Sequence, residues 1–541
     1  MKRYLGLFVA LLSLFSLFSL TIFAATPAAA AADPSIVRTA NGLVKGIVTS
    51  TTRQFLGIPY AAPPVGNLRW KAPQPPASWS KIRDATHFGG ICTQVGTPLT
   101  GVSQPGVDGS EDCLYLNVYT PNPPRGHLPV MVWIHGGGFV GGAANLYDPS
   151  VIAEKGPAIV VTINYRLGPL GFLALPGLSA EDARGTSGNY GLADQQAALR
   201  WVRANIVRFG GDPVNVTIFG ESAGGASVCD QIASPLAAGL FQRGITESGP
   251  CAGRAQTLVT SQANGTAFAK SLGCSTESVS CMRSLPASTL VTAATLNPNR
   301  LPLSFSPNVD GVILPQSVED ALASGQYNHV PVLEGTNLNE DTVFVLAQIS
   351  ATGVPIPLTD AQYTATLQAT FGPAAATQVL AHYPVTSSVS PDQALANAVT
   401  DSRFACPAHT ADTLFSAETP TYAYEFSDPN PFELIQLPFT PPDFALGDAH
   451  ATELTYIFQG RLGGATIPLT PAQLGLSNQM IDYWTTFAAT GDPNSFTTPS
   501  WPLHHAESDL FQSLTSAGNG SHPISTFAVE HQCSFWATLG I

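Results

Sequence analysis

The feature that most constrains the fold is an alternation of short β-branched runs with longer helical patterns. The best candidate strands are residues 116–119, 130–134, 158–164, 216–219 and 330–333, and the best candidate helix is 191–206. Strands that are separated by helices pair in parallel, because the crossover between them needs the length of a helix. We therefore predict an α/β fold, in which a largely parallel sheet carries helices on both faces.

Composition and charge narrow the class of protein. The 541 residues are 44% hydrophobic and 11% charged, which suits a large folded core and excludes disorder as the dominant state. The formal charge of −14, with no basic run, argues against a nucleic-acid partner. No linker divides the chain, so we expect a single domain over residues 33–541. Within it, the Pro-interrupted helical segment 348–398 is expected to be an insertion packed over the sheet.

The N-terminus has the pattern of an export signal. Lys2 and Arg3 precede the apolar stretch 5–23, and small residues follow up to Asp33. This pattern predicts a secretory signal peptide over residues 1–32, and hence a secreted or extracytoplasmic protein with no stable membrane partner after cleavage. The alternative is an uncleaved N-terminal membrane anchor, because an apolar stretch of roughly 20 residues can span a bilayer.

The eight cysteines of an exported chain favour disulfides. Two pairs are close in sequence and two more would form from the cysteines that remain: Cys92/Cys113 and Cys274/Cys281, then Cys229/Cys251 and Cys406/Cys533. The alternative for the two longer pairings is that some of these residues are buried free thiols. No C-x-x-C or H-E-x-x-H motif is present, so we expect neither a metal site nor a cofactor.

A G-x-S-x-G motif, Gly220–Gly224, follows the candidate strand 216–219 and precedes the small-residue helix start at 225–227. In this context the glycines allow a tight strand-to-helix turn, which lifts the hydroxyl of the central serine clear of the sheet. The motif predicts that Ser222 is a nucleophile. The alternative is a glycine-rich turn with an idle serine.

A second glycine motif, His135–Gly138, directly follows the candidate strand 130–134. Glycines without side chains let backbone N–H groups point into a cavity. We predict that the N–H groups of Gly136 and Gly137, with that of Ala223, stabilise the oxyanion of an acyl-transfer reaction.

The same glycines also fit a nucleotide-binding pattern. Gly136, Gly138 and Gly141 spell G-x-G-x-x-G after a strand. However, no helix pattern follows, and the next strand ends at Asn164 without an acidic residue for a ribose. We therefore favour the oxyanion interpretation.

A serine nucleophile needs a base, and in the chain order of this elbow an acid comes next and a histidine last. Glu340 and Asp341 both follow the strand 330–333, and position alone does not choose between them. His450 stands out because it lies in a loop before the apolar segment 453–458. The candidate bases are His382, His409, His450, His504, His505, His522 and His531.

Four blocks that stand in order along the chain carry a family resemblance: Phe55–Ala61, Glu111–Asn117, Gly188–Gln195 and Gly220–Gly225. With them, the sequence from about Ile36 to the C-terminus resembles the carboxylesterase type B, or cholinesterase-like, family of α/β-hydrolases. The resemblance implies the α/β-hydrolase fold. It also implies a serine ester hydrolase that acts on small-molecule esters.

The resemblance also assigns the acid and the base. The acid block of the family falls on Gly335–Asp341 and aligns its glutamate with Glu340, whereas Asp341 stands where the family has glycine. The histidine block, Gly-x-x-His-x-x-Glu, falls on Gly447–Glu453 and makes His450 the base.

Supporting roles are implied in the same way. Ser248 matches a serine that hydrogen-bonds near the catalytic acid. Glu221 places a second negative charge beside the serine, which favours the imidazolium form of the histidine. Structural ion pairs and disulfides of the family fall on Arg69 with Glu111, Arg166 with Asp194, Cys92 with Cys113, and Cys274 with Cys281. The pairs Cys229/Cys251 and Cys406/Cys533 match only a subset of the family.

The loop between Cys92 and Cys113 bears on the substrate. In this family it carries a choline-binding aromatic residue in cholinesterases and an apolar lid in secreted lipases. Here its 20 residues are rich in Gly, Ser, Thr and Pro and contain no aromatic residue. We therefore expect an enzyme that cleaves short to medium acyl or aryl esters through an acyl-enzyme on Ser222. The alternatives are a lipase with a lid elsewhere, an amidase or acyltransferase with the same triad, and a non-catalytic cholinesterase-like binding protein.

Overall fold

A computed structural model describes residues 33–96, 106–253, 255–275, 278–296, 305–352, 357–431, 444–518 and 520–541. The predicted signal peptide, residues 1–32, lies outside these ranges, as does the middle of the Cys92–Cys113 loop. Within the ranges, none of the helices combines the length and apolarity that a membrane span requires.

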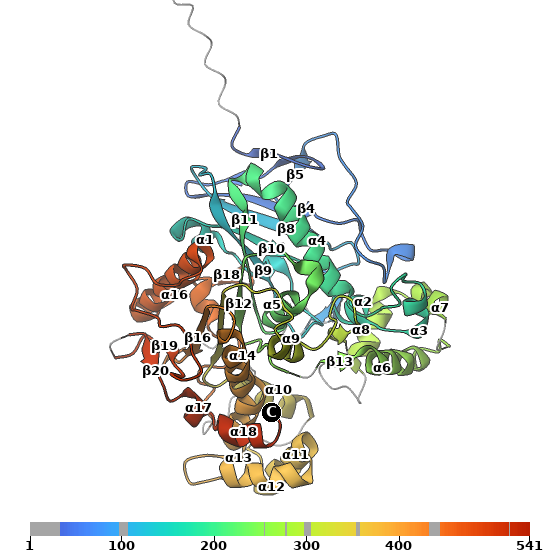
Figure 1. The fold of residues 1–541 in the computed structure, drawn as a ribbon. Coiled ribbons are helices and arrows are strands. Elements are labelled where there is room, and N and C mark those ends of the chain that lie inside the picture. The colour runs from blue at the N-terminus through green and yellow to red at the C-terminus, as the bar shows by residue number, and fades with distance from the viewer. Residues whose placement is uncertain are drawn as a thin grey trace, which may run out of the picture. The chain divides into compact units, whose positions relative to one another are not determined.

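An 11-stranded sheet forms the centre of the domain (Figure 1). In the spatial order given next, neighbouring strands pair in parallel from β10 (Ile159–Ile163) to β19 (Phe511–Leu514). The strands beyond these two pair antiparallel at both edges of the sheet. In spatial order the strands are β20 (His522–Ile524), β19 (Phe511–Leu514), β16 (Thr421–Phe426), β15 (Val332–Asn337), β12 (Arg243–Glu247), β11 (Gly211–Glu221), β9 (Leu128–Ile134), β10 (Ile159–Ile163), β8 (Tyr115–Pro121), β4 (Thr52–Pro59) and β3 (Ile47–Val48).

All five predicted strands lie in this sheet, so the predicted α/β fold is confirmed. Among the C-terminal ends of the predicted strands, that of β15 differs most from the prediction, because this strand ends at Asn337 rather than at residue 333. Its last four residues include Glu334, Thr336 and Asn337, which are fully buried or nearly so. Buried polar residues that are held by hydrogen bonds break the apolar pattern that marks a strand in a sequence, so this part of β15 had no hydropathy signal.

Helices bury both faces of the sheet. Along β9, Val130, Val132 and Ile134 pack into one apolar cluster, whereas Met131 and Trp133 pack into another. The first cluster includes residues of α4 (Tyr190–Asn205) and α5 (Ala223–Ala233), and the second includes residues of α1 (Ser150–Lys155) and α16 (Pro471–Thr490). This double burial explains why β9 is an unbroken apolar run rather than an alternating one.

The remaining elements surround this core. The helices are α2 (Gly168–Phe172), α3 (Pro176–Ala180), α6 (Leu258–Ser271), α7 (Val279–Ser284), α8 (Ala287–Leu296), α9 (Val318–Ser324), α10 (Thr342–Thr352), α11 (Asp360–Phe371), α12 (Pro373–His382), α13 (Pro391–Thr400), α14 (Cys406–Ser416), α15 (Leu454–Ile457), α17 (Phe527–Glu530) and α18 (Cys533–Thr538). The smaller sheets join β1 (Ile36–Thr39), β2 (Gly42–Lys45) and β5 (Arg83–Asp84), β6 (Gln94–Gly96) and β7 (Gly106–Asp108), β13 (Gln256–Thr257) and β14 (Asn308–Val309), and β17 (Arg461–Leu462) and β18 (Ala465–Thr466).

The insertion predicted over residues 348–398 is helical in its described part, where α10 to α13 cover it. These helices pack with α18 into an apolar cluster of their own (Figure 1). That cluster contains no residue of the central sheet among those described. The insertion is therefore anchored by the C-terminal helix rather than by a face of the sheet, which the helical pattern of its own sequence does not reveal.

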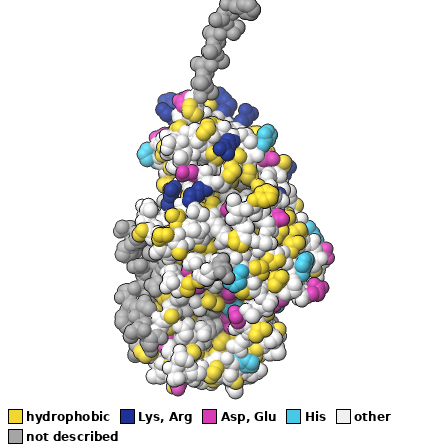
Figure 2. Space-filling view, turned by 90° about the vertical axis from the view of Figure 1, so that its left-hand side faces the viewer, with side chains coloured by type: hydrophobic (Ala, Val, Ile, Leu, Met, Phe, Trp, Pro, Cys, Tyr) yellow, Lys and Arg dark blue, Asp and Glu magenta, His cyan; other side chains and the backbone are white. Residues whose placement is uncertain are grey.

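The four cysteine pairs are disulfide-bonded: Cys92–Cys113, Cys229–Cys251, Cys274–Cys281 and Cys406–Cys533. The side chains on the face in Figure 2 are mostly uncharged, in keeping with a chain in which 11% of residues are charged; acidic groups are scattered over this face, and Lys and Arg side chains gather in its upper part.

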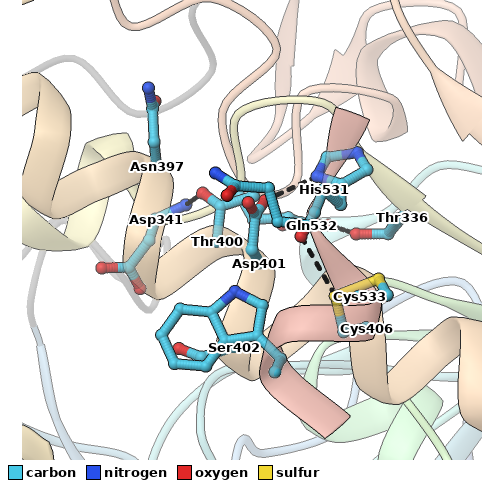
Figure 3. A network of polar contacts seen from close by, with 12 residues as sticks. Thr336, Asp341, Asn397, Thr400, Asp401, Ser402, Cys406, His531, Gln532 and Cys533 are labelled. Carbon is cyan, nitrogen blue, oxygen red and sulfur yellow. Dashed lines mark hydrogen bonds and ion pairs between the residues drawn. A yellow bond between two sulfur atoms is a disulfide. The ribbon is translucent and has the colours of Figure 1, made fainter. Parts of the chain in front are cut away.

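A buried ion-pair network joins the insertion, the sheet and the C-terminal segment, and Figure 3 shows its members Asp401 and His531. His531 Nδ1 lies 2.6 Å from Asp401 Oδ1, at the start of the π-helix η6 (Asp401–Ala405), and Nε2 lies 2.8 Å from Glu425 Oε1 on β16. Tyr383 donates a hydrogen bond of 2.6 Å to Asp401. Burial by itself lowers the pKa of His531, but the two carboxylates raise it to about 10.

We expect His531→Gln to lower the free energy of unfolding by about 3 kcal/mol, because the substitution leaves two buried carboxylates without their cation. The folded protein holds the proton of His531 more tightly than the unfolded chain does. The stabilisation is therefore complete below pH 6.5 and is lost as the pH rises through about 10.

Thermal unfolding of the wild type and the variant, followed by circular dichroism across this pH range, checks the prediction. His522→Gln, at an exposed position, is the control and should change little at any pH. A difference in melting temperature between wild type and His531→Gln that stays constant up to pH 10.5 would contradict it.

Candidate active site

The sheet and α5 are joined by a one-residue turn at Ser222. β11 ends at Glu221, α5 begins at Ala223, and Ser222 between them has φ 57° and ψ −123°. Such a conformation is strained for a residue with a side chain and persists only where the surroundings hold it. A Cβ at Gly224 would lie 2.0 Å from the backbone oxygen of Ile134, so only glycine allows this close approach. The turn has the geometry that the G-x-S-x-G motif predicts.

The loop after β9 lies directly against this turn. A Cβ at Gly136 would lie 2.7 Å from both the backbone oxygen and the carboxylate of Glu221, and 3.1 Å from Cβ of Ser222. In the described part of the chain, the backbone N–H groups of Gly136 and Gly137 donate to no other group. Ala223 is the first residue of α5, where a helix leaves its N–H without an intrahelical acceptor. Unpaired donors of Gly136 and Ala223 thus lie next to Ser222, and that of Gly137 follows Gly136 in the same loop.

His135, at the start of this loop, is not part of the charged site. Its ring stacks on that of Tyr165 with 4.5 Å between the ring centroids, and it is fully buried. Burial lowers the pKa of His135 to about 4, so it is neutral at physiological pH.

The structure brings Glu340, the acid that the resemblance assigns, into contact with His450. Glu340 lies in the turn between β15 and α10, and its Oε2 lies 2.6 Å from Nδ1 of His450. Its Oε1 accepts hydrogen bonds from Thr336 Oγ1 at 2.8 Å and from the backbone N–H of Asn337 at 2.7 Å. Asp341 instead pairs with Arg403 at 3.2 Å, and burial raises its pKa to about 7. Of the candidate bases, all of which lie in described segments, His450 alone contacts Glu340.

A second carboxylate lies on the other side of the His450 ring. Nε2 is 3.0 Å from Oε1 of Glu221, whereas the hydroxyl of Ser222 makes no hydrogen bond to any described residue. Burial by itself lowers the pKa of His450, but Glu221 and Glu340 together raise it well above its ordinary value. This is the imidazolium form that the sequence predicted Glu221 to favour.

Several site residues were not foreseen. Thr336 and Asn337 hold Glu340, and the Asn337 side chain also donates to the backbone oxygen of Ala449 at 3.0 Å, next to His450. Two polar residues at the end of an apolar strand were the available signal for this role. The rings of Phe344 and Phe404 lie 4.9 and 5.1 Å from that of His450, and no motif in the sequence marked either of them.

The structural ion pairs and the hydrogen bond of Ser248, both implied by the resemblance, have different outcomes in the structure. The ion pairs Arg69–Glu111 and Arg166–Asp194 form, at 2.5 and 2.7 Å. The backbone N–H of Ser248 donates to the oxygen of Gly335 at 2.8 Å, but its buried hydroxyl has no hydrogen-bond partner among the described residues. Its predicted bond near the acid stays a prediction.

Comparison with known proteins identifies the family. The model of the carboxylesterase family matches residues 33–536. The chain belongs to the carboxylesterase family. It is 39% identical over 487 residues to the para-nitrobenzyl esterase of Bacillus subtilis (strain 168), a match that covers 87% of this chain and 93% of the relative. It is 36% identical to the fumonisin B1 esterase of Sphingopyxis macrogoltabida, over 90% of this chain and 88% of the relative, and 36% identical to the liver carboxylesterase of Sus scrofa, over 90% and 91%.

Solved structures agree. A thermophilic PNB esterase superposes with a TM-score of 0.77 at 36% identity, covering 93% of this chain and all of the other. This carboxylesterase is therefore a carboxylic ester hydrolase with the α/β-hydrolase fold. Across its described ranges, no group of three or more His, Cys, Asp or Glu side chains is arranged to hold a metal ion.

We expect Glu221→Gln to move the acidic limb of the pH profile of this carboxylesterase to lower pH by about one unit or more, because one of the two carboxylates that raise the pKa of His450 is removed. A base must be neutral to accept a proton, so activity then persists to lower pH.

Values of kcat/KM for p-nitrophenyl acetate, measured as a function of pH, check this shift. Glu181→Gln is the control, because Glu181 pairs with Lys71 and Arg283 in a separate, half-exposed cluster. An acidic limb of Glu221→Gln that coincides with that of the wild type, or lies above it, would contradict the electrostatic role.

Proposed function

We propose that this carboxylesterase hydrolyses esters by two-step acyl transfer through Ser222. The observation that carries the proposal is the buried contact of 2.6 Å between Glu340 and Nδ1 of His450, beside a serine held in a strained turn. In this arrangement the carboxylate orients the imidazole through Nδ1, so Nε2 is the atom that exchanges a proton with the serine hydroxyl once its contact with Glu221 opens.

The steps follow from these positions. The hydroxyl oxygen of Ser222 attacks the ester carbonyl while Nε2 of His450 takes its proton. The N–H groups of Gly136, Gly137 and Ala223 stabilise the oxyanion that forms. His450 then returns the proton to the leaving alcohol, and the acyl group remains on Ser222. Water repeats the sequence and releases the acid.

The contact between Glu221 and His450 requires a rearrangement before the chemical step. Because Nε2 of His450 lies 3.0 Å from Glu221, this contact must open for Nε2 to accept a proton from Ser222. Hydrogen bonds of catalytic groups are commonly loose without substrate and tighten in the substrate complex. Once His450 has accepted the proton, Glu221 stabilises its positive charge.

We propose short to medium acyl or aryl esters as the substrate class. The described ends of the Cys92–Cys113 loop form the antiparallel ribbon of β6 and β7 rather than an apolar helix that could serve as a lipase lid. Two of the relatives, the para-nitrobenzyl esterase and the fumonisin B1 esterase, are named for the small molecules whose esters they act on.

We also propose that the enzyme is exported and loses residues 1–32. Four disulfides support this, because disulfides persist in oxidising compartments. The family match, which begins at residue 33, supports a single catalytic domain that follows the leader.

We expect Ser222→Ala to reduce kcat/KM for p-nitrophenyl acetate by about 10⁴-fold or more, since the whole covalent pathway depends on this hydroxyl. Its melting temperature should match that of the wild type, because the hydroxyl makes no hydrogen bond to a described residue. Ser508→Ala, at an exposed serine, is the control. Full activity in Ser222→Ala would refute the acyl-enzyme mechanism.

We further expect kcat/KM on a p-nitrophenyl ester series from acetate to palmitate to peak at short to medium acyl chains. A peak at palmitate, or activation by emulsified triglyceride, would instead show a lipase. Faster turnover of a matched p-nitroanilide would show an amidase. The absence of any Ser222-dependent rate would show a binding protein.

A further inference from the structure

The disulfide Cys229–Cys251 links two segments that meet behind Ser222. Cys229 lies on α5, about two helical turns beyond the serine, and Cys251 lies in the loop that follows β12. We define residues 248–251 as the clamp loop. We propose that this disulfide, through the clamp loop, positions Ser222 for attack, an inference that rests on the acyl-enzyme mechanism proposed above.

The clamp loop is in direct contact with the turn that carries Ser222. A Cβ at Gly249 would lie 2.4 Å from the backbone oxygen of Ser222 and 2.5 Å from the nitrogen of Ala226, so the loop backbone packs on the first turn of α5. Immediately before the loop, the backbone oxygen of Glu247 accepts a hydrogen bond of 2.8 Å from the N–H of Ser222. Any movement of the clamp loop therefore reaches the nucleophile through backbone contacts.

The same loop is attached to the strand that leads to the acid. Ser248 donates its N–H to the oxygen of Gly335 at 2.8 Å, and the N–H of Cys251 donates to Oε1 of Glu334 at 3.2 Å. Gly335 and Glu334 both lie on β15, which precedes Glu340. The clamp loop thus contacts the serine turn on one side and the strand that precedes the acid on the other. A loop in this place can fix the position of the serine relative to the acid.

Backbone strain in the serine turn and the clamp loop explains why a disulfide between α5 and the clamp loop would help to maintain their geometry. Ser222 and Ser248 have φ of 57° and 50°, in the left-handed region that non-glycine residues avoid. Each such residue is strained and keeps its conformation only if the surroundings oppose relaxation. No helix or strand continues β12 through the clamp loop, and the cross-link to α5 limits how far that loop can relax.

The sulfur atoms are too buried for this disulfide to act as a redox switch in the folded enzyme. Cys229 and Cys251 are 1% and 3% exposed, so a thiol cannot approach either sulfur without unfolding. The disulfide therefore stays intact in the folded enzyme. Its effect on catalysis has to be measured separately from its effect on stability.

The experiment compares two double variants. We expect Cys229→Ala/Cys251→Ala to lower kcat for p-nitrophenyl acetate by about tenfold or more well below its melting temperature, with KM within a factor of about two, because small misplacements of a nucleophile slow the chemical step. Cys274→Ala/Cys281→Ala removes a disulfide that joins the end of the α6 region to α7. It should lose stability but keep the kcat of the wild type. Titration of active sites with diethyl p-nitrophenyl phosphate normalises each rate to folded enzyme.

A third variant keeps the proposal testable if the first does not fold. Gly249→Ala retains the disulfide but forces the clamp loop away from Ser222, and it should show the same loss of kcat at nearly unchanged KM. A wild-type kcat in either Cys229→Ala/Cys251→Ala or Gly249→Ala, or an equal loss of kcat in the Cys274/Cys281 control, would overturn the positioning role. The wild type and Ser222→Ala are assayed first, so that failure of the acyl-enzyme mechanism is seen separately, as a rate that does not depend on Ser222.

Discussion

Parallel pairing of β9, β11, β12 and β15 is the constraint on which the site depends. Because these strands run in the same direction, their carboxyl ends meet at one edge of the sheet. The glycine loop follows β9, Ser222 follows β11, the clamp loop follows β12 and Glu340 follows β15. Residues far apart in the sequence are therefore neighbours without any loop having to cross the domain, and the rigid sheet supplies the accuracy that the proposed acyl transfer needs.

At this edge of the sheet only a few of the buried ionisable groups carry a charge. Burial raises the pKa of Glu247 to about 8 and that of Glu453 well above its ordinary value, and neighbouring carboxylates add to both effects. Buried like charges disfavour one another's ionisation, so protonation relieves the crowding. His450, which lies between Glu221 and Glu340, is the imidazole that this field favours as a cation. In the proposed acyl transfer, the same field stabilises the imidazolium of His450 and raises the pH at which His450 becomes neutral.

Much of the fold could be predicted from the sequence, and the limits have physical causes. Apolar β-branched runs marked the central strands because both faces of the sheet are buried. The sequence did not predict the end of β15, because its residues there are polar and are buried while their hydrogen bonds are satisfied. The contact of the insertion with α18 was missed because helix amphipathicity shows that a face is buried and does not show what covers it.

The sequence by itself determined the serine turn, the glycine loop and the family. Turns of this kind depend on residues within a few positions of one another, such as the glycines on either side of Ser222. The resemblance assigned the roles of Glu340 and His450, but only the tertiary structure shows that their side chains meet and that Glu221 faces Nε2. Glu340 and His450 are 110 positions apart, and whether their side chains meet depends on how β15 and the loop before α15 are packed. Short-range sequence patterns carry no information about distances of that kind.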